Sequence, residues 1–375
     1  MDTTLQQLSG HGQSPWVDYL ARPFVRKGEL ARLVRAGVLG VTSNPTIFRD
    51  AITSGDAYDD RLRELLRTET EPKEVFLALA TEDAREACDV LRPAFDLSCS
   101  GRDGWVSLEV DPRFAHDTNA TIAEALRLHA LVDRPNLMVK IPGTEAGLRA
   151  IEETIARGIP VNVTLLFSLT RHRRAAEAYL RGLRRLHAAG GDLSTVASVA
   201  SFFVSRVDSE ADRRLTETDG PDDLHGTLAL ANARLAYETY RGVFDGPEWT
   251  PLYEAGARPQ WCLWASTSMK DEDRGDVEYV EQLIGTGTID TMPPATAEAF
   301  LDHGRVAVTL TEDTESAQEA RRILDRFESA GIAYDDVVAV LEREGVEKFR
   351  GAFTELMDGI DEKRGQLLAG QGTGA

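Results

Sequence analysis

Two patterns of apolar residues alternate along the chain. Short, nearly continuous apolar runs predict buried strands, because the strands of a parallel sheet covered on both faces are apolar almost throughout. Eight such runs occur, at residues 14–20, 37–45, 104–112, 136–143, 159–168, 196–205, 260–267 and 286–294. Longer stretches separate most of them and carry apolar residues three and four positions apart, which predicts amphipathic helices. These stretches lie at residues 56–66, 75–91, 119–132, 145–156, 168–186 and 226–244.

This alternation of eight strands with helices predicts an α/β fold, a single (β/α)₈ barrel. Length alone leaves the domain count open, since 375 residues allow one large domain or two smaller ones. Two more helical patterns follow the eighth strand, and we expect this C-terminal extension, residues 312–366, to pack outside the barrel. The ends of the chain, residues 1–14 and 368–375, are expected to be mobile.

Charge and composition narrow the class of protein. The 62 acidic and 42 basic residues give a net charge of -20, which opposes binding to nucleic acid or to an anionic membrane. An anionic ligand must therefore be held by a few local cations. The three cysteines are far apart and odd in number, so no disulfide framework or cysteine-rich metal site is indicated. The chain lacks a signal-peptide pattern and an apolar run long enough for a membrane span, and we expect a cytoplasmic enzyme or binding protein.

Polar residues gather at the carboxyl ends of the predicted strands, where the active sites of barrels lie. They comprise two acids, a lysine, several amides and hydroxyls, and two further cations. In chain order they are Asp18, Asn44, Glu109, Lys140, Asn162, Thr164, Ser201, Arg206, Ser266 and Lys270. A barrel would bring all of them to one mouth.

Lys140 is the most informative of these residues. It interrupts the apolar run "NLMVKIPG", whereas the other five lysines of the chain stand in polar surroundings. Burying a charged ammonium is costly, and a desolvated neutral lysine can attack a carbonyl to form a Schiff base. A lysine whose stem passes apolar neighbours on its way to solvent would leave the same pattern. The local sequence weighs these two interpretations about equally.

The other residues have ordinary structural interpretations when taken singly. Glu109 and Asp18 could cap backbone amides or pair with arginine, and Asn44 before Pro45 could form a turn. Arg206 and Lys270 could be solvated surface charges. Together with Lys140, however, the two acids supply the proton carriers that a Schiff-base enzyme needs. The seven histidines show no metal-ligand spacing, and no metal site is predicted.

Six motifs in chain order resemble those of the transaldolase family. They are "GVTSNPTIF" at 40–48, "VSLEVDPR" at 106–113, "LMVKIPGTEAGLRAIE" at 137–152, "GIPVNVTLLFS" at 158–168, "ASFFVSRVD" at 200–208 and "WASTSMKD" at 264–271. The resemblance implies a (β/α)₈ barrel of the class I type, without metal or other cofactor. Such an enzyme moves a dihydroxyacetone unit from sedoheptulose 7-phosphate to glyceraldehyde 3-phosphate and yields erythrose 4-phosphate and fructose 6-phosphate, a step of the pentose phosphate pathway.

The resemblance also implies a role for each matched residue. Lys140 would form the Schiff base, Glu109 would move protons at the imine with Thr164 and a water, and Asp18 would take the hydroxyl proton that starts cleavage. The dihydroxyacetone portion would contact Asn44, Asn162 and Ser201. The phosphate would contact Arg206 and Ser266. Many relatives carry an arginine where this chain has Ser268, and Lys270 is expected to supply that charge.

Two rival functions remain at the level of sequence. A simple aldolase of the same barrel family would release free dihydroxyacetone, but such relatives tend to carry a tyrosine at the position of Phe203 and to lack the acid at Glu109. A catalytically silent barrel that binds sugar phosphates is the other rival, although every expected catalytic residue type is present. The expected partners are a phosphorylated ketose and an aldose, and the expected state is a monomer or a homodimer.

Overall fold

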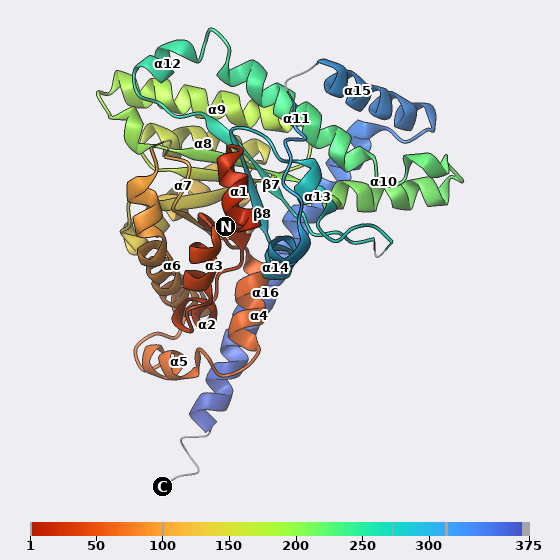
Figure 1. The fold of residues 1–375 in the computed structure, drawn as a ribbon. Coiled ribbons are helices and arrows are strands. Elements are labelled where there is room, and N and C mark those ends of the chain that lie inside the picture. Colours follow the sequence, from red (N-terminus) through yellow and green to blue (C-terminus); the bar gives the residue numbers. More distant parts are fainter. Residues whose placement is uncertain (1, 100, 272, 312–313, 370–375) are drawn as a thin grey trace.

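The eight predicted strands form a closed barrel in which each strand is parallel to its neighbours in chain order (Figure 1). A computed structural model describes residues 2–99, 101–271, 273–311 and 314–369. The strands are β1 (Gln13–Asp18), β2 (Gly40–Thr42), β3 (Trp105–Glu109), β4 (Leu137–Pro142), β5 (Val161–Leu166), β6 (Ser198–Phe203), β7 (Gln260–Ala265) and β8 (Thr288–Met292). The predicted (β/α)₈ barrel is therefore confirmed.

Helices cover the outside of the barrel between successive strands and after β8. They are α2 (Arg22–Arg26), α3 (Glu29–Ala36), α4 (Pro45–Thr53), α5 (Asp59–Leu65), α6 (Pro72–Leu97), α7 (Thr118–Val132), α8 (Glu145–Ala156), α9 (Leu169–Ala188), α10 (Ser205–Glu217), α11 (Leu228–Phe244), α12 (Thr250–Glu254), α13 (Glu278–Gln282) and α14 (Pro294–His303). Three short 3₁₀ turns join some of them, η1 (Pro112–Phe114), η2 (Leu193–Thr195) and η3 (Asp222–Leu224). No helix in the described ranges is both long and apolar enough to cross a membrane.

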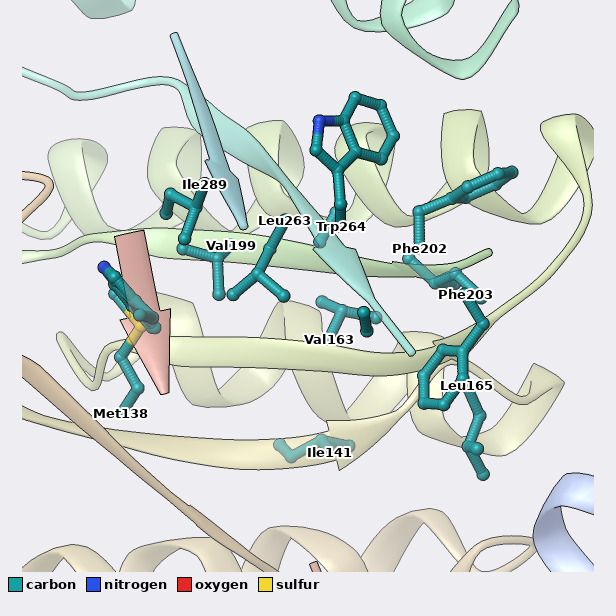
Figure 2. Close-up of a cluster of buried hydrophobic side chains, with 14 of the residues drawn as sticks. Met138, Ile141, Val163, Leu165, Val199, Phe202, Phe203, Leu263, Trp264 and Ile289 are labelled. Carbon is teal, nitrogen blue, oxygen red and sulfur yellow. The ribbon is translucent and has the colours of Figure 1, made fainter. Parts of the chain in front are cut away.

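Apolar side chains of β4 to β8 form one buried cluster around the barrel wall (Figure 2). Met138, Val163, Val199, Leu263 and Ile289 belong to it, and each is fully buried. Successive side chains of a strand point to opposite faces, so Lys140 shares its face of β4 with Met138, two positions before it. Lys140 pairs in register with Glu109 on one side and with Asn162 on the other.

The N-terminal stretch contains a helix, α1 (Thr4–Gly10), although the sequence suggested that residues 1–14 are mobile. Thr3 caps this helix by accepting a hydrogen bond from the Gln6 backbone, and the Gln6 side chain completes a capping box. Leu5 and Leu8 are fully buried. Regular structure thus begins at Thr4, because two leucines at helical spacing bury one face of this helix.

The C-terminal extension consists of two helices with different positions. Helix α15 (Thr314–Ser329) packs on α11, outside the barrel, as expected. Helix α16 (Tyr334–Ala369) runs beside α4 and also contacts α6 and α10 (Figure 1). Its Phe349 reaches the barrel mouth. Residues 312–313 and 370–375 of the predicted extension and mobile tail lie outside the described residues.

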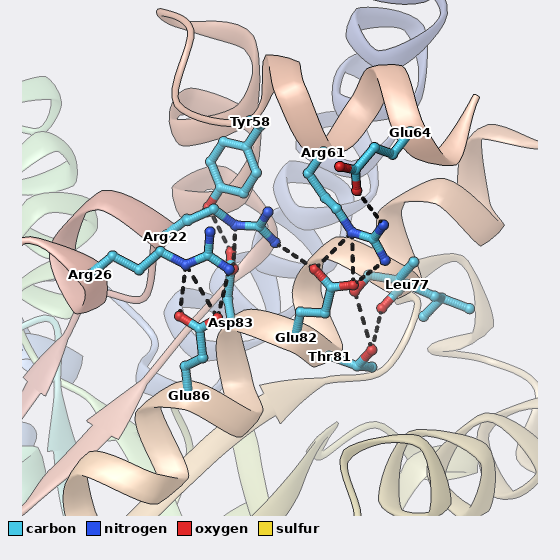
Figure 3. Close-up of polar contacts among 11 residues, drawn as sticks. Arg22, Arg26, Tyr58, Arg61, Glu64, Leu77, Thr81, Glu82, Asp83 and Glu86 are labelled. Carbon is cyan, nitrogen blue, oxygen red and sulfur yellow. Dashed lines mark hydrogen bonds and ion pairs between the residues drawn. The ribbon is translucent and has the colours of Figure 1, made fainter. Parts of the chain in front are cut away.

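Buried charges tie α2, α5 and α6 together on the side of the barrel (Figure 3). Arg22, only 3% exposed, donates to Asp83 at 2.8 Å and to Glu82 at 3.1 Å. The Tyr58 hydroxyl donates to the second oxygen of Asp83 at 2.8 Å and accepts from the Arg22 backbone. Arg61 binds Glu82 from the other side. Every oxygen of Asp83 therefore has a partner.

Candidate active site

Lys140 and Glu109 form a buried pair at the carboxyl ends of β4 and β3. Their Nζ and Oε2 atoms are 3.5 Å apart, and the two side chains are only 5% and 3% exposed. The register of the two strands fixes this approach, since Glu109 and Lys140 are direct neighbours across the sheet. The structure thus brings the predicted nucleophile and one predicted acid together.

A backbone carbonyl holds the amine of Lys140. Its Nζ donates a hydrogen bond of 2.8 Å to the carbonyl oxygen of Ser43, just after β2. Ser43 is itself fixed, because its hydroxyl donates to the Ser107 carbonyl at 2.8 Å. The Lys140 amine is therefore buried with two oxygen contacts, the Ser43 carbonyl and, at 3.5 Å, the Glu109 carboxyl.

Glu109 is suited to exchange protons near neutral pH. Burial raises the pKa of its carboxyl to about 7, and the attraction of Lys140 opposes this rise without cancelling it. Neither carboxyl oxygen accepts a hydrogen bond from the described residues, and the buried hydroxyl of Thr164 is also without a partner there. Three polar atoms at the base of the site thus keep their hydrogen-bonding capacity free for reacting groups.

Asp18, at the end of β1, accepts a hydrogen bond from a hydroxyl of the neighbouring strand β2. Thr42 Oγ1 donates to its Oδ1 at 2.7 Å and lies 2.8 Å from the hydroxyl of Thr291. Asp18 and both threonines line the same hollow as Lys140. The second predicted acid therefore faces the amine from across the barrel.

The three predicted contacts for the dihydroxyacetone portion differ in how they are used. Asn44 caps α4, since its side-chain oxygen accepts from the Ile47 backbone at 3.1 Å. Its amide nitrogen remains available to the hollow. Ser201 donates to Asn162 at 2.7 Å, and Asn162 donates to Ser107 at 3.0 Å. Asn162 is fully buried, so it orients Ser201 from below.

The hollow above Lys140 extends towards a group of cations. Eight of the eleven predicted site residues line it, namely Asp18, Asn44, Lys140, Ser201, Phe203, Arg206, Ser266 and Lys270. The other three, Glu109, Asn162 and Thr164, are buried beside this lining. The Arg206 guanidinium lies over the ring of Phe203 at 5.0 Å, which positions it at the far wall.

The loop after β7 carries Ser266 and Lys270 and is held in an unusual conformation. Ser266 has a φ of 60°, a left-handed value that non-glycine residues seldom adopt, and its hydroxyl lies 2.8 Å from that of Ser205. Thr267 donates to buried Asp290 of β8 at 2.8 Å. These contacts fix the direction of the loop, while Lys270 reaches solvent and donates to Ser268.

Sequence reasoning missed several residues of this region. The carbonyl of Ser43 gives no side-chain signal. Thr42 and Ser107 stand two positions before Asn44 and Glu109, and the period of a strand could have placed them on the same face. Phe349 lies 146 residues beyond the end of β6, in helix α16, and nothing in its helical pattern indicates that it borders the hollow.

A buried lysine beside a proton carrier, with a second carboxylate opposite, can form and resolve an imine. The cations at the far wall can hold an anionic end of the same ligand. The part of the chain that the structure describes contains no cluster of three or more histidine, cysteine, aspartate or glutamate side chains placed to hold a metal ion.

Comparison with known proteins agrees with this geometry. Residues 15–360 match the model of the family described as Transaldolase/Fructose-6-phosphate aldolase. The chain is 50% identical over 373 residues to a transaldolase of Parafrankia sp. (strain EAN1pec), covering 98% of this chain and 100% of the relative. It is 51% identical over 365 residues to a transaldolase of Thermobifida fusca (strain YX), covering 96% and 98%. It is also 51% identical over 359 residues to Transaldolase 1 of Streptomyces avermitilis, covering 95% and 94%.

Proposed function

This chain belongs to the transaldolase/fructose-6-phosphate aldolase family, and we propose from that premise that it acts as a transaldolase in which Lys140 carries the substrate as a Schiff base. The observation that carries the proposal is the buried pair of Lys140 and Glu109, 3.5 Å apart, at the base of a hollow that ends at Arg206. The reaction would transfer dihydroxyacetone from sedoheptulose 7-phosphate to glyceraldehyde 3-phosphate, a step of the pentose phosphate pathway.

Imine formation would begin when Lys140 passes a proton to Glu109 and its nitrogen attacks the ketone carbon of the donor. The resulting carbinolamine must lose its hydroxyl as water, which requires an acid. Glu109 can supply that proton, because the raised pKa leaves its carboxyl protonated in part at neutral pH. Thr164 presents its free hydroxyl nearby and would orient the water that leaves and later returns.

Carbon–carbon cleavage then needs a base on the opposite side. Asp18 would accept the proton of the C4 hydroxyl, the C3–C4 bond would break, and its electron pair would move into the imine to form an enamine on Lys140. The aldose product would leave while the three-carbon unit stays bound. Attack of the enamine on the acceptor aldehyde, with return of the proton from Asp18, would form the new bond, and hydrolysis would free Lys140.

The substrate would lie along the hollow from Lys140 to the cations. Asn44 and Ser201, with Asn162 behind Ser201, would bind the hydroxyls of the dihydroxyacetone portion. Arg206, Ser266 and Lys270 would bind the terminal phosphate, since charge-assisted hydrogen bonds to a dianion are stronger than neutral ones. The presence of two cations in the wall of the hollow that holds Lys140 supports transfer between phosphorylated sugars.

Two features favour transfer over simple aldol cleavage. Glu109 is present and buried beside the lysine, and Phe203 lines the hollow where simple aldolases tend to carry a tyrosine. We place the enzyme in the cytoplasm, as a monomer or homodimer that needs no metal. Exhaustive chelation should therefore leave its activity intact, and rescue by a divalent ion would contradict this part of the proposal.

Reduction of the imine provides the direct test. Borohydride treatment in the presence of fructose 6-phosphate should add a sugar-derived mass to Lys140, because reduction turns the imine into a stable secondary amine. Peptide mapping identifies the modified residue. Lys140→Met should show no adduct and should lose at least about 10⁴-fold in turnover, since no other group can replace the nucleophile. Modification of Lys270 instead would overturn the assignment.

A further inference from the structure

Helix α16 brings a third cation towards the proposed phosphate site. A second hollow lies outside the one above Lys140, and the two share Arg206, Ser266 and Lys270 in their walls. The outer hollow is also lined by Lys348 of α16. The next residue, Phe349, lines the inner hollow. The two hollows therefore adjoin at a wall formed by Arg206, Ser266 and Lys270.

These cations have no carboxylate partners within the described ranges of the chain. Arg206 lies between two rings, 5.0 Å from Phe203 and 5.9 Å from Phe349, and forms no ion pair. Lys270 donates to the Ser268 hydroxyl, and Lys348 forms no ion pair either. This contrasts with the surface, where arginines are widely paired with acids.

The two acids in the wall of the outer hollow reduce its positive charge but do not cancel it, because Glu344 alone faces three cations. Glu210 accepts hydrogen bonds from Arg213 at 2.8 Å and from Arg214 at 2.7 Å, so its charge is already matched. Glu344 stands one helical turn before Lys348, yet no ion pair joins them. The centre of the group thus remains positive in a chain whose net charge is -20.

The positive charges of the group repel one another, and the pKa of Lys348 reflects this repulsion. Its pKa is lowered first by the charge of Arg206, then by partial burial, and then by Lys270. Gathering like charges is unfavourable in the free protein, and binding of a dianion between them would remove the penalty. An uncompensated cluster of this kind is typical of an anion-binding site.

The position of Lys348 is fixed by contacts elsewhere on α16. Glu355 pairs with Arg49 of α4 at 2.6 Å, and Lys363 pairs with Asp59 of α5 at 2.7 Å. Phe353 packs edge-on against Phe76 of α6. The helix is held against α4, α5 and α6, so the lysine is presented at the mouth by a fixed element (Figure 1).

We propose that Lys348 binds the terminal phosphate of the sugar together with Arg206 and Lys270, and that α16 thereby makes the enzyme select phosphorylated sugars over free ones. This inference rests on the proposed function and extends it to a residue of the C-terminal helix. Lys348 lies at the exposed edge of the group, so its contribution should be smaller than that of Arg206.

Donor kinetics test the inference. Lys348→Met keeps most of the stem and removes the charge, and it should raise KM for fructose 6-phosphate about two- to fivefold, the range of an exposed ion pair. KM for free fructose and kcat should not change. Arg350→Met is the matched control, because Arg350 lies on the same helix, is exposed and pairs with Glu347 away from the hollow. Arg206→Ala should give the largest increase, raising KM for fructose 6-phosphate about tenfold or more.

Inorganic phosphate provides a probe that does not depend on turnover. Lys348→Met should weaken competitive inhibition by phosphate by a similar factor, whereas Arg350→Met should leave it unchanged. Borohydride trapping of free fructose on Lys140 should be equal in the wild type, Lys348→Met and Arg350→Met. Equal changes for phosphorylated and free donors, or unchanged phosphate inhibition, would overturn the role of Lys348. Failure of trapping in the wild-type protein would instead overturn the proposed function.

Discussion

Lys140 and Glu109 at the barrel mouth are about as thoroughly buried as Arg22 and Asp83 between α2 and α6, yet the two pairs differ in their partners. Arg22 contacts Asp83 at 2.8 Å, and Tyr58 binds the second oxygen of Asp83. Glu109 lies 3.5 Å from Lys140, and neither of its oxygens accepts a hydrogen bond from the described residues. Both carboxyl oxygens of Asp83 therefore have a hydrogen-bond partner, whereas both carboxyl oxygens of Glu109 remain available.

Burial affects the acids of both clusters in the same direction. It raises the pKa of Asp83 to about 6 and that of Glu109 to about 7, in each case against the attraction of a cation. A raised pKa therefore does not by itself mark an active site. Glu109 differs from Asp83 because its two carboxyl oxygens are without partners and lie beside a lysine that lines a hollow, where a substrate or water can bind the acid. The first cluster fixes helices, and the second is suited to chemistry.

The largest expected effect separates the two clusters by activity. Glu109→Gln keeps the shape of the side chain but cannot carry a proton, so kcat should fall about 10²- to 10⁴-fold. Its melting temperature at pH 8 should change little, because the burial penalty that raises the pKa of Glu109 outweighs the attraction to Lys140 that the substitution removes. Steady-state kinetics with fructose 6-phosphate and erythrose 4-phosphate, together with thermal unfolding, measure both quantities.

Glu124→Gln is the matched control for that experiment. Glu124 is 6% exposed, and its carboxylate is engaged in an ion pair with Lys73 at 3.0 Å. Its substitution should lower the melting temperature and leave kcat unchanged. If Glu109→Gln behaved like this control, Glu109 would belong with the structural charges and the comparison would fail.

The next effect concerns stability at the other cluster. Asp83→Ala should lower the free energy of unfolding by about 3–5 kcal/mol, because it leaves the buried guanidinium of Arg22 without its main partner. Asp89→Ala on the same helix removes an exposed acid paired with Arg134 and should cost about 1 kcal/mol or less. Urea unfolding measures both. The folded Asp83→Ala protein should still form the adduct at Lys140, and loss of the adduct would show that the two clusters are coupled.

The sequence predicts the strands and their polar ends because both signals are local. Each strand is an apolar run of a few residues, and a polar residue at its carboxyl end stands out, as Lys140 does in "NLMVKIPG". The barrel then brings these ends together whatever the loops do. The positions of Glu109 and Asp18 near Lys140 could therefore be predicted without knowing a single contact.

The position of α16 could not be predicted in the same way. Its helical pattern shows that one face is buried, but periodicity does not say which surface covers that face. Lys348 stands in a polar stretch and reads as a solvated lysine, although α16 places it beside Arg206. The contact of Lys140 with the Ser43 carbonyl could not be predicted either, because every residue has a backbone carbonyl and the sequence does not indicate which one accepts a hydrogen bond.

Asp290 lies between Asp83 and Glu109 in the number of its carboxyl oxygens that have a hydrogen-bond partner. The pH dependence of its contribution to stability gives the last test of the comparison. Thr267 binds one of its oxygens at 2.8 Å, while the other is buried without a partner among the described residues. Burial raises the pKa of its carboxyl to about 7, against about 3.9 in an unfolded chain. Between these values the folded protein binds a proton that the unfolded chain has lost. The contribution of Asp290 to stability is therefore full below pH 4, declines by up to about 1.4 kcal/mol for each pH unit, and is lost above pH 7.

Asp290→Asn removes this dependence while its amide oxygen can still accept from Thr267. The amide nitrogen is left without a partner, and this should cost about 1–3 kcal/mol at every pH. The difference in unfolding free energy between variant and wild type should consequently shift in favour of the variant as pH rises from 5 to 7, and should stay constant from 7 to 8. Contributions of Asp83 and Glu109 cancel, because both proteins contain them. Urea unfolding at several pH values measures the slope, and a flat difference would mean that the carboxylate is ionised and fully satisfied, as a structural charge would be.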